Sequence, residues 1–249
     1  MNFFEQGIPL GRWFKITVTL HWTFVIYAVF RVMDSPTPGI DALFMGLLFL
    51  TVLLHEFGHA LSCKALGGVA LHIVLWPLGG IAFVQPPGTA WAYLITTVCG
   101  PLVNAILWPL FLIIGNYGLP FLAQHMDTHS MAFTILEATC YAMIEINRWL
   151  LIFNLIPCYP MDGGRILQEI LWIVLGLRRS LQIAGMLGTV IGCGFIVLGL
   201  GLYEIHIPVA DIRLGHDYNF LLAVIGLMCA MQSFGIYRRS QEIGTWRKN

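Results

Sequence analysis

Two histidines and a glutamate in the stretch LLHEFGHAL, residues 53–61, have the spacing of a catalytic metal site. His55 and His59 are four residues apart. On a helix they share one face, about 6 Å apart along the axis, so both imidazoles can reach one metal ion. Glu56 then stands beside the ion, where a carboxylate can take a proton from metal-bound water. The pattern predicts a hydrolytic metal centre.

Apolar residues flank this stretch on both sides, so the three titratable groups are expected inside a membrane-spanning helix. Ionisable side chains are costly in hydrocarbon and are functional candidates by default. Two simpler alternatives stay open, a polar contact between packed helices and a proton relay.

A catalytic zinc site normally has three protein ligands and one open position, so a third ligand is needed. No histidine or acidic residue follows closely after Leu61, and the best candidate is Asp162 in FNLIPCYPMDGGR. Two prolines before it end a helix, and two glycines after it allow a tight turn that presents the carboxylate inward. The alternative is that Asp162 caps the helix that follows.

The elements that position these residues are expected to be membrane helices. The chain has 249 residues, 58% of them hydrophobic and only 10% charged, whereas soluble domains carry about 25% charged residues. We therefore predict an all-α polytopic membrane protein. The length of the chain suits about six transmembrane helices. The net charge is zero and no basic run occurs, which argues against a nucleic-acid partner.

The predicted spans cover residues 15–33, 40–66, 91–117, 131–156, 181–203 and 218–237. The first run follows basic residues, as a secretion signal would. However, it is long for a signal core and no cleavage site of small residues follows it, so we predict a mature helix. Residues 67–88 are punctuated by Gly and Pro and predict a small membrane-associated β element between the second and third helices. Residues 163–176 predict a short amphipathic helix.

Basic residues predict the orientation of these spans. If the N-terminus is inside, ten basic residues fall in cytoplasmic segments and two on the opposite side. This bias predicts that both termini are cytoplasmic.

Three motifs together resemble the site-2 protease family of intramembrane zinc metalloproteases. They are HEFGH at residues 55–59, GPLVN at 100–104 and FNLIPCYPMDGG at 153–164. They occur in the family's order, and the resemblance covers about residues 16–176. It implies that His55, His59 and Asp162 bind one Zn²⁺ per chain and that Glu56 is the general base.

The resemblance also suggests residues that contact the substrate. Asn154 and Asn104 are expected to bind the substrate or stabilise the oxyanion, although an interhelical hydrogen bond is the alternative for each. The strand predicted at 79–85 could pair with an unwound substrate or only plug the domain. His21 could face the cavity or bond to a neighbouring carbonyl.

The resemblance implies cleavage of peptide bonds within or near the transmembrane segments of other membrane proteins. The expected partners are such a substrate and the lipid bilayer, and no oligomeric state is predicted. We expect one protease domain over residues 1–249, with core motifs at 16–176 and further helices at 181–237. It is of the minimal type, without an inserted or C-terminal regulatory domain.

Two other functions compete with proteolysis. An inactive adaptor could keep the fold and bind client helices, but it would have no need for Glu56. A metal-ion transporter could use the same three ligands as a transit site. Repeated halves with discontinuous helices would then be expected, and the sequence shows no such repeat.

Overall fold

The computed structural model describes residues 7–77, 79–202, 205–207, 212–214 and 219–245. Both chain ends, whose side of the membrane was predicted above, and Leu78 lie outside these ranges. The chain forms two compact units, Met1–Ile152 and Phe153–Asn249.

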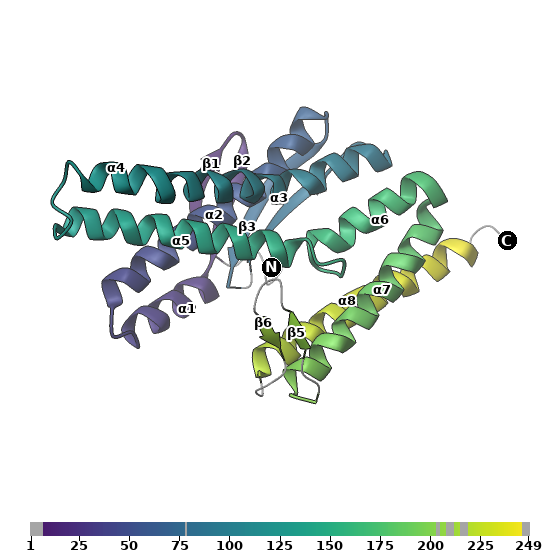
Figure 1. Ribbon diagram of the computed structural model, residues 1–249. Coiled ribbons are helices and arrows are strands. Elements are labelled where there is room, and N and C mark those ends of the chain that lie inside the picture. The colour runs from purple at the N-terminus through teal and green to yellow at the C-terminus, as the bar shows by residue number, and fades with distance from the viewer. Residues whose placement is uncertain (1–6, 78, 203–204, 208–211, 215–218, 246–249) are drawn as a thin grey trace. The chain divides into compact units, whose positions relative to one another are not determined.

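The first unit contains a four-stranded sheet in the order β1-β2-β3-β4 (Figure 1). The strands are β1 (Gly7–Trp13), β2 (Ile16–His21), β3 (Val69–Trp76) and β4 (Gly79–Gln85). β1–β2 and β3–β4 are antiparallel pairs, whereas β2 and β3 run parallel. A parallel pair needs a crossover connection, and here it consists of helices α1 (Trp22–Met33) and α2 (Pro38–Ala65).

One apolar cluster joins this sheet to the face of α2. Side chains alternate along β2, so that Ile16 and Val18 are fully buried while Thr17 between them is exposed. β-branched residues of this kind pack well on a pleated surface. The cluster consists of Ile16, Val18, Leu53, Phe57, Ala60, Ala70, Ile73 and Leu75. This cluster packs α2, the helix with the HEFGH motif, against β2, which precedes it in the sequence, and β3, which follows it.

Three further helical segments and part of a fourth complete the first unit. They are α3 (Ala90–Ile113), the π-helical turn η2 (Ile114–Gly118), α4 (Leu119–Ala123) and most of α5 (Met131–Asn154). α3 approaches α2 closely at Gly58, where a Cβ atom would lie 2.3 Å from the carbonyl oxygen of Cys99. The missing side chain lets the two backbones touch.

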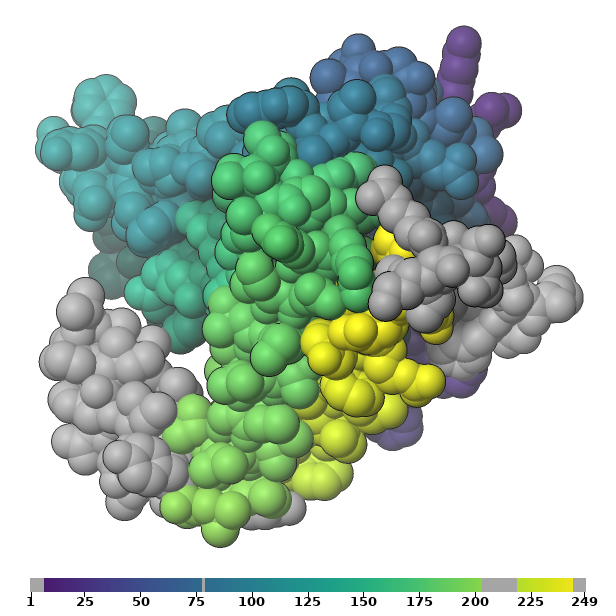
Figure 2. Space-filling model, turned by 90° about the vertical axis from the view of Figure 1, so that its right-hand side faces the viewer, coloured from purple at the N-terminus to yellow at the C-terminus, as the bar shows by residue number. Residues whose placement is uncertain are grey.

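The second unit is built on two helices that pack along their length. Its elements are α6 (Asp162–Leu175), α7 (Leu177–Gly199), β5 (Ile205–Ile207), β6 (Ile212–Leu214) and α8 (Phe220–Thr245). Figure 2 shows α7 in green against α8 in yellow. Glycines of α7 face small residues of α8; a Cβ atom on Gly192 would lie 2.4 Å from the backbone nitrogen of Ala230. Close backbone approach through small residues is typical of membrane helix pairs.

Four helical segments are long and apolar enough to cross a membrane in the described part of the chain: Pro38–Ala65, Ala90–Ala123, Leu177–Gly199 and Phe220–Ile243. Each coincides with a predicted span. The predicted run 131–156 is also a helix, α5, but it is not among the four. Together with the apolar composition, these helices indicate an integral, multi-pass membrane protein.

The predicted spanning helix over residues 15–33 is confirmed only in part, because a helix covers residues 22–33 alone. Residues 16–21 form strand β2, and α1 has only 12 residues, a length of about 18 Å against about 30 Å of hydrocarbon. The strands predicted within 67–88 are confirmed as β3 and β4. However, they form only half of a sheet whose other half precedes α1. The short helix predicted at 163–176 is confirmed as α6.

Candidate metal centre

Helix α2 places His55, Glu56 and His59 in the interior of the first unit. Their exposed fractions are 5%, 6% and 4%. The Nε2 atoms of the two histidines are 3.1 Å apart, so both imidazoles converge on one point, as the four-residue spacing predicts.

A backbone carbonyl determines which nitrogen of His59 carries the proton. Its Nδ1 atom lies 2.9 Å from the carbonyl oxygen of Thr96. A carbonyl oxygen only accepts hydrogen bonds, so Nδ1 is the donor. In the neutral imidazole, Nε2 is then an acceptor with a lone pair.

Two hydrogen-bonded asparagines, Asn104 and Asn147 (the asparagine relay), determine which nitrogen of His55 carries the proton. Asn147 on α5 donates from Nδ2 to the carbonyl oxygen of Met143, at 2.8 Å. Its Oδ1 therefore accepts from Nδ2 of Asn104 on α3, at 3.0 Å. The Oδ1 atom of Asn104 in turn accepts from Nδ1 of His55, at 2.7 Å. Because a carbonyl cannot donate, the Met143 end sets the direction of the whole chain, and Nε2 of His55 becomes an acceptor too.

Two acceptor nitrogens that face each other at 3.1 Å repel unless a cation lies between them. Neutral imidazole is the commonest metal ligand, and a hydrogen bond at the other ring nitrogen is the usual way to orient it. Two nitrogens on one tetrahedral zinc ion are about 3.3 Å apart at ordinary Zn–N distances. The pair therefore fits zinc.

Strand β4 covers Glu56 at a glycine. A Cβ atom on Gly80 would lie 2.3 Å from Cγ of Glu56 and 2.6 Å from its Oε1 atom. Only a residue without a side chain fits there, so the start of β4 lies directly on the carboxyl group. This contact limits where the carboxylate can go.

We expect Gly100→Ala to weaken metal binding. A Cβ atom on Gly100 would lie 2.2 Å from both Cε1 and Nε2 of His59, so the imidazole must move off the shared point. With zinc as the probe ion, affinity should fall at least about tenfold, in line with other changes that misplace a ligand. A competition titration against a chromogenic chelator measures this. The matched control is Gly46→Ala on α2, where a Cβ atom meets nothing within 4 Å; equal affinities for the two variants would contradict the expectation.

Asp162 is the first residue of α6 and belongs to the second unit. Its side chain is buried, with 7% exposed. The N-cap position is occupied by Met161, which makes no side-chain cap bond, so Asp162 lies one residue past the position of the predicted cap. A Cβ atom on Gly163 would lie 2.4 Å from the carbonyl oxygen of Leu155. The glycine therefore lets the preceding loop fold back onto the helix start.

The loop before α6 is also attached to α8, because the backbone N–H of Tyr159 donates to Oγ of Ser233 at 3.1 Å. Burial raises the pKa of Tyr159 above that of an ordinary phenol, and the nearby Glu169 raises it further. Arg165 has the opposite, smaller effect. The phenol is therefore neutral at ordinary pH.

The remaining residues that were predicted to contact the substrate lie at several different positions in the structure. Asn104 lies in the first unit, fully buried, between His55 and Asn147. Asn154 is the last residue of α5 and lies half-buried in the second unit. His21 ends β2 and caps α1, with Nδ1 2.6 Å from Oγ1 of Thr23. The predicted strand 79–85 is β4, at one edge of the sheet.

Sequence reasoning missed Asn147 and the two glycines that touch the site, Gly80 and Gly100. Asn147 could have been predicted from the sequence, because it is a polar amide in an apolar helix. It lies two turns before Asn154 and therefore on nearly the same face. The glycines could not have been predicted, because only the folded contacts show what each one adjoins.

Comparisons with known proteins show which family the chain is similar to. The model of peptidase family M50 matches residues 116–198. "Zinc metalloprotease MJ0392" of Methanocaldococcus jannaschii is 33% identical over 200 residues, which are 79% of this chain and 55% of the relative. "Putative zinc metalloprotease sll0528" of Synechocystis sp. is 32% identical over 204 residues, 78% of this chain and 50% of the relative. The chain thus spans about half the length of these curated relatives.

A solved structure extends the similarity to nearly the whole chain. The site-2 protease from Methanocaldococcus jannaschii matches with a TM-score of 0.59 and 26% identity, over 93% of this chain and 95% of that one. The fold is that of a site-2 protease. The chain belongs to peptidase family M50, the site-2 proteases, as the three motifs predicted.

Proposed function

We propose that the protein is an intramembrane zinc metalloprotease that hydrolyses peptide bonds within or near the transmembrane segments of other membrane proteins. The observation that carries the proposal is the pair of acceptor nitrogens 3.1 Å apart, with Glu56 next to them under β4. Family membership supports the reaction class, and the relatives' names support zinc.

His55, His59 and Asp162 are proposed to hold one zinc ion per chain. Asp162 is supported by its place in the DGG sequence that the family resemblance includes and by its buried position at the start of α6. When bound, zinc lowers the pKa of a water ligand toward neutrality and polarises a carbonyl.

Glu56 is proposed to move the proton. As a carboxylate it accepts a proton from the attacking water and later gives it to the nitrogen of the leaving amine. Its packing against Gly80 limits the positions that the carboxylate can take.

β4 is proposed to bind the substrate as an added strand. Within the part of the chain that the structure describes, it pairs with β3 alone, so its other edge can accept a partner. A substrate helix must unwind before its carbonyls can be attacked. An added strand replaces the hydrogen bonds that the helix then loses, which are costly to leave unmade in a membrane.

The two predicted substrate amides receive different proposals. Both ends of the Asn104 amide are engaged by protein groups, so we propose that it positions His55. Asn154 is half-buried and stays our candidate for steadying the oxyanion.

Metal removal tests the proposed function. We expect a chelator to reduce cleavage of a tagged single-span substrate in proteoliposomes to background, and about one equivalent of zinc per chain to restore it. Cleavage by metal-free protein would contradict the mechanism.

The ligand set is tested by metal analysis of His55→Ala and Asp162→Ala. Both variants should lose the bound zinc. If Asp162→Ala retains zinc with wild-type affinity, Asp162 is not a ligand.

A further inference from the structure

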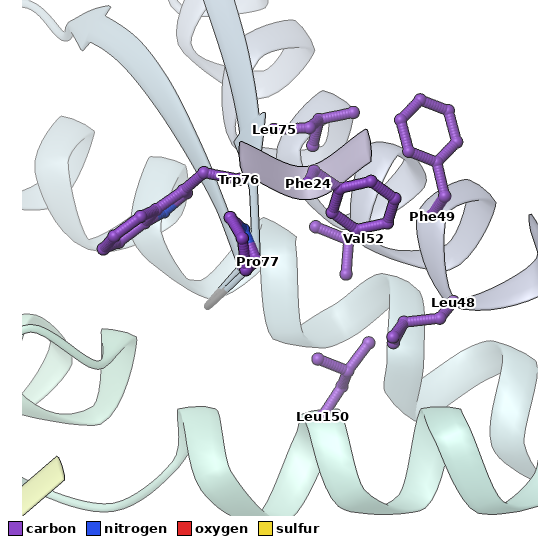
Figure 3. Close-up of a pocket in the computed structure, with 9 residues that line it drawn as sticks. Phe24, Leu48, Phe49, Val52, Leu75, Trp76, Pro77 and Leu150 are labelled. Atoms are coloured by element: carbon purple, nitrogen blue, oxygen red, sulfur yellow. The ribbon is translucent and has the colours of Figure 1, made fainter. Parts of the chain in front are cut away.

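An apolar cavity of about 180 Å³ lies in the first unit beside α2 (Figure 3). Val52 and Leu150 project toward the space next to Pro77. The lining residues come from α1, α2, α5, the end of β3, the start of β4 and the turn between these strands. They are Phe24, Leu48, Phe49, Val52, Leu75, Trp76, Pro77, Gly79 and Leu150. This lining contains no charged side chain, so it suits an apolar ligand.

The cavity adjoins the proposed catalytic base on two elements. Val52 precedes Glu56 by four residues on α2, one turn or about 6 Å along the same face. On β4, Gly79 lines the cavity and the next residue, Gly80, lies against Glu56. A peptide that pairs with β4 would therefore pass both the base and the cavity.

The size of the cavity limits what it can hold. An apolar cavity of about 150 Å³ binds benzene, so a phenyl group or a branched aliphatic side chain fits. Strand residues advance about 3.3 Å each. A distance of 6 Å or slightly more therefore corresponds to about two or three residues of an extended chain.

We propose that this cavity is a specificity subsite that accepts one large apolar side chain, such as Phe or Leu, of the substrate's membrane segment. That residue lies about two or three positions from the scissile bond. The inference rests on the proposed function, and it adds a substrate preference at the same site. The cavity lies close to the base, because Val52 is one helical turn from Glu56 and Gly79 precedes the glycine that touches it, and this position favours a substrate side chain over a lipid chain.

Filling the cavity should change substrate preference. The substrates are single-span segments with Phe or Ala placed, in turn, at each position within four residues of the scissile bond. For wild type we expect one position where Phe is favoured. In Val52→Phe, the kcat/KM ratio of the Phe to the Ala substrate at that position should fall at least about tenfold, since small size differences in an apolar pocket change kcat/KM by about 10- to 200-fold.

The matched control is Leu50→Phe on the same helix. Leu50 is 44% exposed and does not line the cavity. We expect this variant to keep the wild-type preference. The same loss of preference in both variants would overturn the subsite, as would an unchanged ratio in Val52→Phe.

A second readout does not depend on cleavage. In Glu56→Gln, a substrate with a photoreactive phenylalanine at the favoured position should cross-link to peptides containing Leu48, Phe49 or Val52. Moving the probe by one residue should lose these products, because successive side chains of a strand point to opposite faces. Cross-links at other places, or products that do not depend on probe position, would overturn the subsite.

The two proposals fail differently. If wild type cleaves and Glu56→Gln does not, but cavity filling changes neither preference nor cross-linking, the subsite is wrong and the protease stands. If Glu56→Gln cleaves as fast as wild type, the mechanism fails and the subsite fails with it.

Discussion

Glu56→Gln is expected to lower the cleavage rate by about 10²- to 10⁴-fold, the usual contribution of a general acid–base group, and to leave the zinc content unchanged. Glutamine has nearly the same shape, so the packing against Gly80 and the histidine pair should persist. Its amide, however, cannot take up a proton from water at neutral pH. The loss should therefore appear in kcat, not in metal binding.

Initial rates in proteoliposomes, measured together with elemental analysis of the same samples, check this expectation. The matched control is Glu137→Gln, which makes the same chemical change at an exposed position on α5. Equal rates for Glu56→Gln and wild type would remove Glu56 from the chemistry. A loss of zinc from Glu56→Gln would mean that the residue supports the metal.

Asn147→Leu is expected to weaken zinc binding by about 10- to 100-fold, the usual cost of losing a partner of a metal ligand. Leucine has a similar size but neither donates nor accepts. The Asn104 amide would then lose the acceptor that orients it, and the proton on His55 would no longer be directed to Nδ1. The histidine could present an N–H group to the metal instead of a lone pair.

A conservative variant separates this role from simple packing. Asn147→Asp keeps an acceptor for Asn104, so it should recover part of the affinity that Asn147→Leu loses. Thr51→Val is the control, because it removes another buried polar group whose bonds go to the Leu47 carbonyl and to Sδ of Met143, not to a histidine or to an amide of the relay. We expect its zinc affinity to match wild type in a chelator competition. If Thr51→Val weakens zinc as much as Asn147→Leu does, the asparagines have only a structural role.

The histidine pair could be predicted from sequence because its geometry is local. Once the segment is a helix, a four-residue spacing places both imidazoles on one face without any information about other elements. β3 and β4 were predictable for a similar reason, since Gly, Pro and β-branched residues mark their limits within the segment itself.

β2 could not be recognised in this way. Its residues 16–21 are apolar enough to begin a membrane helix, and the backbone that stabilises them as a strand belongs to β3, which pairs Thr17 with His72. The asparagine relay also joins residues that are far apart in the sequence. Asn104 and Asn147 are 43 residues apart, and only the packing of α3 against α5 shows that the second amide orients the first. Contacts between distant segments decided both cases.

The crossover from β2 through α1 and α2 to β3 ties the proposed metal ligands to the stability of the sheet. The helix with both histidines is the connection between two neighbouring parallel strands, so β3 cannot open fully without disturbing that helix. A metal ion that binds only the closed form should then slow amide hydrogen exchange at Ile73, Val74 and Leu75. At a free zinc concentration about 100 times the dissociation constant, linkage adds about 2.7 kcal/mol, or roughly a hundredfold slower exchange through such openings. Amides of β1, at the far edge, should respond less, so exchange rates would report metal occupancy strand by strand.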